Sequence, residues 1–404
     1  MQTEISTALL RDVRNRFSER QPKIVSLIRA LVETESPSGD LAGSRAVVNL
    51  LADAAAGARG VTSIDRVDVP NFGQHLVIRA FQDRAGAGNI LLVGHTDTVH
   101  PRGSIAERPW RLEANRIYGP GIFDMKANCA LAVALLHAWD DFDLVPRCGI
   151  TLALMCDEEV GSLSGWPVLK EIARTDNVQR ALILEPPAPG GQAKTGRKGT
   201  GIFQMHVEGR AAHAGLEPEK GASAILELAK QIVRLHEFNG SGSGIKVNVG
   251  VVQGGTRSNV VAAEASAELD VRFATAAEAK TIEERLLSIV PDDPRVKVRV
   301  SGSINRPPLE RTEQVLELYG LARNIAGLLD FELGETQVGG ASDGNFLASI
   351  GIPVLDGLGI DGDGAHADHE HIIVDDIPRR GATTARTWLS SRRCTRHAAR
   401  PLGG

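Results

Sequence analysis

The strongest constraint on the fold is a change of rhythm in the middle of the chain. From 21 to 160, helix-forming segments alternate with short apolar strands such as 90–94 and 150–155. This alternation is typical of an α/β domain, in which helices cover a central sheet. After the proline- and glycine-rich stretch 186–191, the pattern becomes strand, helix, strand, strand, helix, strand. The sequence therefore predicts two different architectures in one chain.

The second pattern matches a known supersecondary unit. Strands are predicted at 200–207, 245–252, 263–273 and 296–300, with helices at 221–238 and 276–290. This β-α-β-β-α-β order is that of a ferredoxin-like α+β unit. The α/β pattern then resumes, with an apolar strand at 352–355. We therefore predict a large domain made of 1–195 and 305–404, into which a smaller domain, 196–304, is inserted.

Charge and composition limit the classes of partner. The 404 residues carry a formal net charge of −5, so a broad basic surface for nucleic acid or an anionic membrane is not expected. No apolar run approaches the length that spans a bilayer. Residues 1–20 favour an amphipathic helix over an export signal, and the four cysteines lack CxxC spacing. These features predict a cytoplasmic protein that acts on a small molecule.

A histidine and an aspartate follow the predicted strand 90–94. His95 and Asp97 are two residues apart at the strand end, where such residues share a face. A neutral imidazole is a good zinc ligand, and a carboxylate that accepts its second N–H fixes the tautomer. A surface histidine beside an acid is the ordinary alternative, so this motif alone does not establish a metal site.

Further polar residues stand at turns or after other strands. Asp124 lies in the Gly/Pro turn 118–126 before an apolar helix, where a helix cap is the alternative to a ligand. The three acids 157–159 follow a buried strand and should repel one another unless cations neutralise them. Glu185 follows another strand, and His366 ends a late glycine-rich loop.

Together these segments offer imidazole nitrogens and carboxylate oxygens, a mixture that suits zinc, cobalt or manganese. If two ions shared one carboxylate, each ion could have three protein ligands and an open position for water. An adjacent carboxylate that binds neither ion would then be available as a base.

These residues resemble the dizinc aminoacylase and carboxypeptidase family, and most closely its bacterial glutamate carboxypeptidase branch. The resemblance runs from about Val25 to Leu389, and its motifs are 94–99, 119–126, 157–161, 185–186 and 364–366. It implies an α/β metallopeptidase domain, whose mixed sheet is flanked by helices. It also implies that the inserted ferredoxin-like domain serves for dimerisation and as a lid.

The resemblance further implies roles for individual residues. Asp124 would bridge two Zn²⁺ ions, with Co²⁺ or Mn²⁺ as possible substitutes. The remaining ligands would be His95 and Glu185 on one ion, and Glu159 and His366 on the other. Glu158 would be the general base and Asp97 would orient the His95 imidazole. The peptide bond that follows Asp124 is expected to be cis.

Four more residues match the family pattern, three of them, His213, Asn259 and Arg272, in the inserted domain and one, Gly340, in a later glycine-rich loop. His213 would reach across a homodimer into the partner's active site and stabilise the oxyanion. Asn259 and Arg272 would bind the substrate, with Arg272 on its terminal carboxylate, and Gly340 would line the same pocket. A strand arginine paired with an acid and an asparagine in a turn are the ordinary alternatives.

The expected function is zinc-dependent hydrolysis of the amide bond to a C-terminal amino acid, with glutamate as the expected residue. The substrate would be a small peptide or an N-acyl conjugate, such as a folyl-type one, with a free carboxylate. Two alternatives remain open, an N-acyl amino acid deacylase or dipeptidase, and a zinc-binding dimeric scaffold without activity. Glu158 favours an enzyme, because a metal-binding scaffold needs no carboxylate beside its ligands.

Overall fold

The computed structural model divides the chain into two compact units. It describes all residues except 1–6, 139, 141–145, 147, 241–243 and 390–404. The large unit consists of Met1–Thr195, Arg311–Gln337 and Ser342–Gly404, and the small unit of Gly196–Glu310 and Val338–Ala341. The two units are described separately below.

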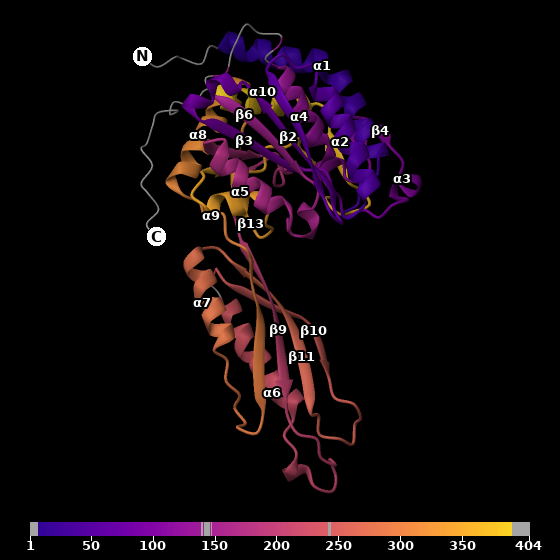
Figure 1. Ribbon diagram of the computed structural model, residues 1–404, viewed down its shortest axis with the longest axis vertical. Helices are drawn as coiled ribbons and strands as arrows, with labels where there is room; N and C mark the ends of the chain where they lie inside the picture. Colours follow the sequence, from indigo (N-terminus) through magenta and orange to yellow (C-terminus); the bar gives the residue numbers. More distant parts are fainter. Residues whose placement is uncertain (1–6, 139, 141–145, 147, 241–243, 390–404) are drawn as a thin grey trace. The chain divides into compact units, whose positions relative to one another are not determined.

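A six-stranded mixed sheet forms the centre of the large unit (Figure 1). Its order is β1 (Val61–Val69), β2 (Gly73–Ala80), β6 (Gly149–Met155), β3 (Asn89–His95), β7 (Val178–Ile183) and β14 (Val354–Leu355). Strand β3 runs parallel to β6 and β7, whereas β2 pairs antiparallel with β1 and β6. The predicted mixed sheet flanked by helices is thus confirmed.

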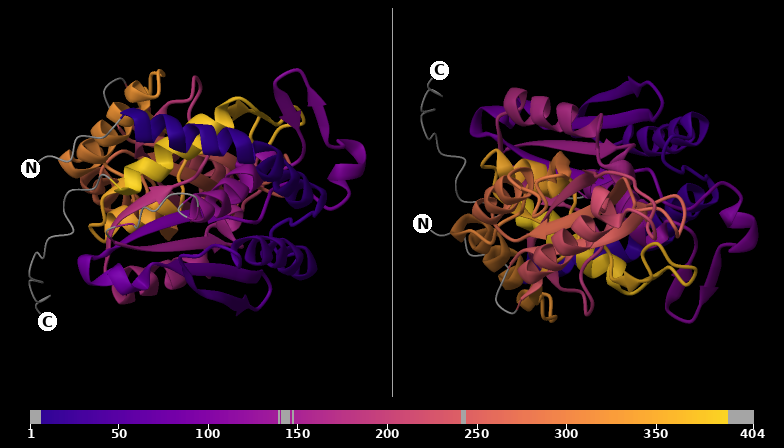
Figure 2. Two further views of the ribbon diagram at one scale, coloured as in Figure 1. Left: turned by 90° about the horizontal axis from the view of Figure 1, so that it is seen from above. Right: turned by 90° about the horizontal axis from the view of Figure 1, so that it is seen from below.

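Helices cover this sheet on both sides. Figure 2 shows α1 (Thr7–Glu33) and α10 (Asp376–Leu389) on one side and α5 (Gly165–Thr175) on the other. The remaining helices are α2 (Leu41–Ala55), α3 (Ser104–Glu107), α4 (Ala127–His137), α8 (Glu313–Leu328) and α9 (Asp343–Ser349). Every residue of β3 and β6 is buried, as expected for central strands covered on both faces. Burial on both faces explains why the sequence shows continuous apolar runs at these two strands.

A second, smaller sheet lies in the large unit, and two loops begin or end at its strands. Its order is β15 (Gly362–Asp363), β16 (His371–Ile373), β5 (Arg116–Tyr118) and β4 (Arg111–Glu113). The loop with Asp124 follows β5, and the loop with His366 joins β15 to β16. Because β5 and β16 are paired, these two loops leave the sheet from neighbouring strands. Two other short strands, β8 (Ala193–Arg197) and β13 (Glu335–Val338), pair with each other.

The small unit has the predicted ferredoxin-like arrangement. Its antiparallel sheet has the order β10 (Lys246–Gly254), β11 (Glu264–Phe273), β9 (Gly199–Glu208) and β12 (Lys297–Arg306), with helices α6 (Ala224–His236) and α7 (Ala276–Leu287). Alternate residues of β11 are buried in the hydrophobic core of the small unit, which includes Phe203, Leu228 and Ile282. Strand β12 continues to Arg306, beyond the predicted strand end at 300 and the predicted domain limit at 304, because Arg306 still pairs with Thr200 of β9.

No helix among the residues that the structure describes is long and apolar enough to cross a bilayer. Cys129 and Cys156 are buried free thiols, Cys148 is also buried, and Cys394 lies outside the described residues.

Candidate metal centre

Three parallel strands bring candidate ligands to one edge of the large sheet. Strand β3 ends at His95, β7 is followed by Glu185, and β6 is followed by the turn that contains Glu159. The carboxyl ends of parallel neighbours meet at the same edge, which is where α/β sheets place their binding sites. The sheet topology therefore explains why residues far apart in the sequence lie together.

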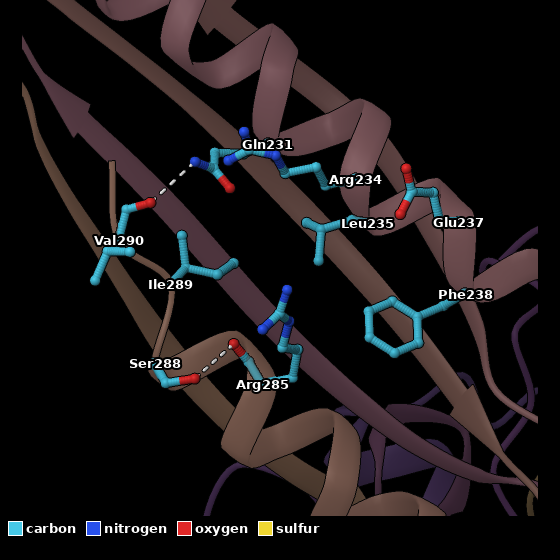
Figure 3. Close-up of a pocket in the computed structure, with 9 residues that line it drawn as sticks. All are labelled: Gln231, Arg234, Leu235, Glu237, Phe238, Arg285, Ser288, Ile289 and Val290. Carbon is cyan, nitrogen blue, oxygen red and sulfur yellow. Dashed lines mark hydrogen bonds between the residues drawn. The ribbon is translucent and has the colours of Figure 1, made fainter. Parts of the chain in front are cut away.

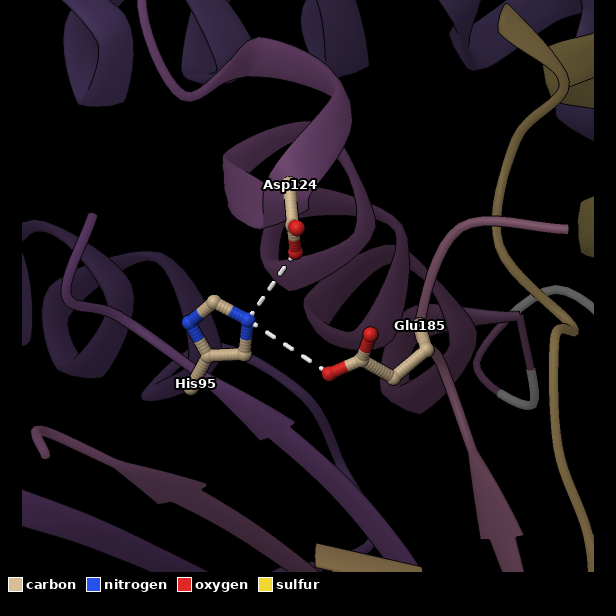
Figure 4. A group of neighbouring side chains, drawn as sticks. All are labelled: His95, Asp124 and Glu185. Atoms are coloured by element: carbon tan, nitrogen blue, oxygen red, sulfur yellow. Dashed lines mark hydrogen bonds and ion pairs between the residues drawn. The ribbon is translucent and has the colours of Figure 1, made fainter. Parts of the chain in front are cut away.

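The first group of candidate ligands consists of His95, Asp124 and Glu185 (Figure 4). The Nε2 atom of His95 is 3.1 Å from Asp124 Oδ1 and 3.5 Å from Glu185 Oε1. One donor atom from each residue lies within 4.8 Å of the other two. His95 is only 1% exposed, and its Nδ1 atom contacts Asp97, so Nε2 is the ring nitrogen that faces this group.

The second group consists of Asp124, Glu159 and His366. The Nε2 atom of His366 is 3.3 Å from Asp124 Oδ2 and 3.2 Å from Glu159 Oε2. Asp124 thus directs one carboxylate oxygen to each group and lies between them. The structure brings together all five predicted ligands in the two predicted sets.

The conformation of the loop before α4 places Asp124. Gly121 has φ of 70°, and a Cβ atom there would lie 2.4 Å from the Thr98 side chain, so only glycine fits. Asp124 and Met125 have non-helical dihedral angles, and the bond between them is cis, as the resemblance implied. The N-cap residue of α4 is Lys126. Asp124 is therefore not the helix cap that the sequence left open.

Glu159 has an oxygen that a cation would satisfy. Its Oε1 atom is buried, and no hydrogen-bond donor within the described part of the chain reaches it. Burial raises the pKa of Glu159, although a hydrogen bond to His366 opposes the shift. A desolvated carboxylate oxygen without a partner is costly, and metal coordination removes that cost. The donor set of imidazoles and carboxylates fits a pair of divalent ions.

The carboxylates change the protonation of both histidines. Hydrogen bonds to Asp124 and Glu159 raise the pKa of His366 to about 10. Burial opposes charge on His95, but hydrogen bonds to Asp124 and Asp97 raise its pKa well above the ordinary value. Burial likewise opposes charge on Asp124, but both histidines hold its pKa below the ordinary range. The centre therefore strongly favours positive charge.

Asp97 connects the two groups. The Nδ1 atom of His95 is 3.0 Å from the backbone oxygen of Asp97 and 3.4 Å from its Oδ1. The same carboxylate accepts the backbone N–H groups of Glu158 and Glu159, each at 3.2 Å, and the Ser38 hydroxyl at 2.6 Å. Asp97 thus contacts the ring of one candidate ligand and holds the turn that carries another. Glu158 stands in this turn, but neither ligand group includes it.

Two predicted residues of the small unit are neighbours. His213 is exposed, and its Nδ1 accepts the N–H of Gly215 at 3.1 Å. The backbone N–H of Ala214 donates to the oxygen of Asn259 at 3.0 Å, which joins their loops. The tie between these loops is internal to the small unit.

Arg272 and Gly340 already have contacts of their own. Arg272 forms a bidentate ion pair with Asp270, with distances of 2.7 and 2.8 Å, so the ordinary alternative of a strand arginine paired with an acid is what the structure shows. The backbone oxygen of Gly340 accepts from Arg197 at 3.1 Å. A role for these residues in substrate binding remains a prediction.

A separate hollow lies on the small unit, between α6 and α7 (Figure 3). It encloses about 460 Å³ and is lined by apolar side chains such as Leu235 and Phe238 and by Arg234 and Arg285. None of the predicted site residues lines it. The hollow therefore has no part in the predicted site.

Sequence reasoning missed two buried residues next to the centre. Glu370 accepts the backbone N–H of Asp124, and His100 contacts Glu370. The only signal in the sequence was an acid between His369 and His371, a short distance after His366. A single sequence does not reveal such a long-range contact.

The chain matches the model of peptidase family M20/M25/M40 over residues 91–390. The chain belongs to this family. It is 30% identical over 379 residues to carboxypeptidase G2 from Pseudomonas sp. (strain RS-16), a match that covers 91% of this chain and 89% of that protein. It is 28% identical over 317 residues to succinyl-diaminopimelate desuccinylase from Delftia acidovorans, covering 73% of this chain and 80% of that protein.

Solved structures of other peptidases have the same fold. Aminopeptidase PepT from Bacillus cereus ATCC 10987 matches with a TM-score of 0.75 at 20% identity, covering 92% of this chain and 98% of that one. The Bacillus subtilis protein YXEP, described as a dinuclear metal-binding peptidase of family M20, matches with a TM-score of 0.69 at 14% identity and the same coverage. The predicted family and fold are confirmed, and the chain is an enzyme that hydrolyses peptide or amide bonds.

Zinc binding to protein that a chelator has stripped of metal should release protons and strengthen as the pH rises. A zinc ion and a proton compete for the same imidazole nitrogen, and the pKa of His366 is about 10 while that of His95 is also raised. An imidazole must be neutral to bind an ion, so the raised pKa values mean that a number of protons, up to one for each ring, should leave as two ions bind. Calorimetric titration in two buffers of different ionisation enthalpy measures this number. A heat independent of the buffer would contradict the prediction.

Proposed function

We propose that this peptidase is a zinc-dependent exopeptidase that releases a C-terminal amino acid, glutamate, from peptides or N-acyl conjugates. The observation that carries the proposal is Asp124, which directs one oxygen to each of two His/carboxylate groups. The 30% identity to carboxypeptidase G2 supports carboxypeptidase activity. The resemblance of the sequence motifs to the bacterial glutamate carboxypeptidase branch supports glutamate as the released amino acid. The buried Glu159 Oε1, which accepts no hydrogen bond from the described residues, supports a metal-dependent mechanism.

The two ligand groups would each hold one divalent ion. His95 and Glu185 would bind the first ion, Glu159 and His366 the second, and Asp124 both. Imidazole and carboxylate donors suit Zn²⁺, with Co²⁺ or Mn²⁺ as possible substitutes. Bound there, such ions would lower the pKa of a water molecule and polarise the carbonyl group of the substrate.

Glu158 would be the general base. It belongs to the same turn as Glu159 but to neither ligand group, and the backbone of both residues is held by Asp97. Its carboxylate would take a proton from the attacking water and then give it to the leaving nitrogen of the amide. A general base placed in this way accounts for the presence of two adjacent glutamates.

The small unit would bind the substrate and form a homodimer. His213, whose Nε2 has no partner within the described residues, would stabilise the oxyanion in the partner chain's site. Arg272 would clamp the terminal carboxylate of the substrate, with Asn259 and Gly340 beside it. An exposed ion pair contributes little, about 0–1 kcal/mol, so a substrate carboxylate can replace Asp270 on Arg272 at low cost.

A deacylase or dipeptidase of the same family is the second candidate. The 28% identity to a desuccinylase favours it, because the same hydrolytic centre serves different acyl groups. The scaffold without activity, which the sequence left open, does not agree with membership in a peptidase family.

The adjacent pair Glu158 and Glu159 gives a direct test of the mechanism. Glu158→Gln should keep two ions per chain and nearly normal KM, while kcat falls by about 100- to 10,000-fold, because only proton transfer is lost. Glu159→Gln is the matched control and should weaken one ion instead, because a ligand is lost. Metal content and turnover are measured on the same purified proteins. If the Glu158 variant loses an ion and the Glu159 variant keeps both, the two roles are reversed.

Mixed dimers test whether His213 acts across subunits. Glu158→Ala and His213→Ala chains should each be nearly inactive, and mixing them should restore activity once the dimers exchange subunits. One site of each mixed dimer then combines an intact Glu158 with the partner's intact His213. Exchange is followed with two tags of different size. Complete exchange without recovery of activity would show that His213 does not act in the partner's site.

The preferred substrate can be determined with a panel of N-acyl and folyl conjugates of glutamate, aspartate and neutral amino acids. Release of glutamate should be fastest, and Arg272→Lys should raise KM by roughly tenfold, because lysine cannot clamp a carboxylate with two parallel hydrogen bonds. Asp270→Asn is the matched control and should not raise KM, because it removes only the competitor for the guanidinium group. Faster release of neutral amino acids, or an unchanged KM of the Arg272 variant, would contradict the assignment.

A further inference from the structure

The buried carboxylate of Glu370 holds the loop that carries Asp124. Glu370 is 2% exposed. Its Oε1 accepts the backbone N–H groups of Phe123 and Asp124 at 2.8 and 2.9 Å, and its Oε2 accepts that of Gly121 at 2.7 Å. Three backbone donors of one short loop therefore converge on one side chain.

A fourth donor on this carboxylate is a buried histidine. The Nε2 atom of His100 is 2.6 Å from Glu370 Oε2. Both terminal nitrogens of Arg108 are 3.4 Å from His100 Nδ1, and because a guanidinium group can only donate, this Nδ1 accepts. The proton of the neutral ring is thus on Nε2, which donates to Glu370. Arg108 also pairs at 2.9 Å with Asp368, a residue at the surface.

Glu370 connects the loops that supply two candidate ligands. It lies in the same loop as His366, and its backbone oxygen accepts the N–H of Gly119 at 3.3 Å. The hydrogen bond between its side chain and Asp124 joins residues 246 positions apart. Glu370 thus fixes the Asp124 loop against the His366 loop through both its side chain and its backbone.

The Asp124 loop needs such support from outside. Asp124 and Met125 have non-helical dihedral angles, and α4 begins only at Ala127. The N–H groups of Phe123 and Asp124 therefore lie outside the regular hydrogen bonding of the helix, and Glu370 accepts both. A metal ligand must be held to within about 0.5 Å of its productive position, so the acceptor of these bonds controls the position of the Asp124 carboxylate.

We propose that Glu370 is a positioning residue of the metal centre, which sets Asp124 relative to His366 and is itself held by His100. The proposal rests on the proposed function, because it requires that the two ligand groups bind ions. Glu370 belongs to neither group, so its effect is transmitted through the backbone of Asp124.

The test is the zinc affinity of Glu370→Gln. Glutamine has nearly the same shape, but its amide nitrogen cannot accept an N–H bond, so backbone donors of the loop lose their partner. Zinc affinity should fall by about 10- to 100-fold, the usual effect of removing a group that orients a ligand. The full-length chain is stripped with a chelator and titrated with Zn²⁺ against a competing chelator, while circular dichroism confirms folding.

Glu35→Gln is the matched control. The Glu35 carboxylate also accepts backbone N–H groups, those of Gly103 and Ile105 at 2.8–3.0 Å, in a loop without candidate ligands. Its loss should leave zinc affinity unchanged. Wild-type affinity in Glu370→Gln, or an equal loss in both variants, would overturn the proposal. If the wild-type chain itself binds no zinc, the proposed function fails as well, so the two failures are distinguishable.

A second pair of variants keeps Glu370 in place. His100→Gln retains an amide N–H donor near the position of the imidazole Nε2 and should bind zinc almost normally. His100→Leu removes the donor and should weaken zinc binding by several-fold. This pair decides the outcome even if Glu370→Gln does not fold. Equal zinc affinities of the two His100 variants would show that His100 does not hold Glu370 in place, and this part of the proposal would be overturned.

Discussion

Repulsion among carboxylates governs the architecture of the large unit. In each ligand group an Asp124 oxygen lies within 4.8 Å of an oxygen of a second acid, which is Glu185 in the first group and Glu159 in the second, and much of the surface of these side chains is buried. Like charges at such distances in a desolvated space are unfavourable unless cations lie between them. Hydrogen bonds to these carboxylates raise the pKa values of His95 and His366. The fold must hold these groups together against their own electrostatics, and much of the surrounding structure serves that purpose.

The supporting structure is made of acids that bind backbone rather than ions. Asp97 accepts the N–H groups of the Glu158–Glu159 turn, and Glu370 accepts those of the Asp124 loop. Charge-assisted hydrogen bonds from N–H groups stabilise these buried carboxylates without a metal. The centre therefore has an inner set of acids directed at the ligand groups and an outer set directed at the loops.

The sequence predicted those parts of the protein that depend on local pattern. Buried strands such as 90–94 gave continuous apolar runs, so their ends, and with them His95 and Glu185, could be placed. The β-α-β-β-α-β order likewise appeared in the periodicity of the small unit. The resemblance to a family was needed to choose the ligands among many acids, because Glu158 and Glu159 have no distinguishing pattern.

Long-range polar contacts could not be predicted in this way. The hydrogen bond between Glu370 and Asp124 spans 246 positions, and no periodicity links the two residues. The pairing of Arg272 with Asp270 is local, yet the sequence did not show whether the arginine faces an acid or stands free. The predicted end of β12 came too early, because the strand continues to Arg306 through its pairing with β9 and not because of its composition.

The order of the ligands along the chain has a consequence for biosynthesis. A nascent chain that has emerged from the ribosome as far as Glu185 contains His95 and Asp124, and so every side chain of the first group. It lacks His366 and Glu370, which are translated only after the whole of β9 to β12. All side chains of the first group are thus present early in translation, whereas the second group, and the support that Glu370 gives to Asp124, must wait until translation is nearly complete.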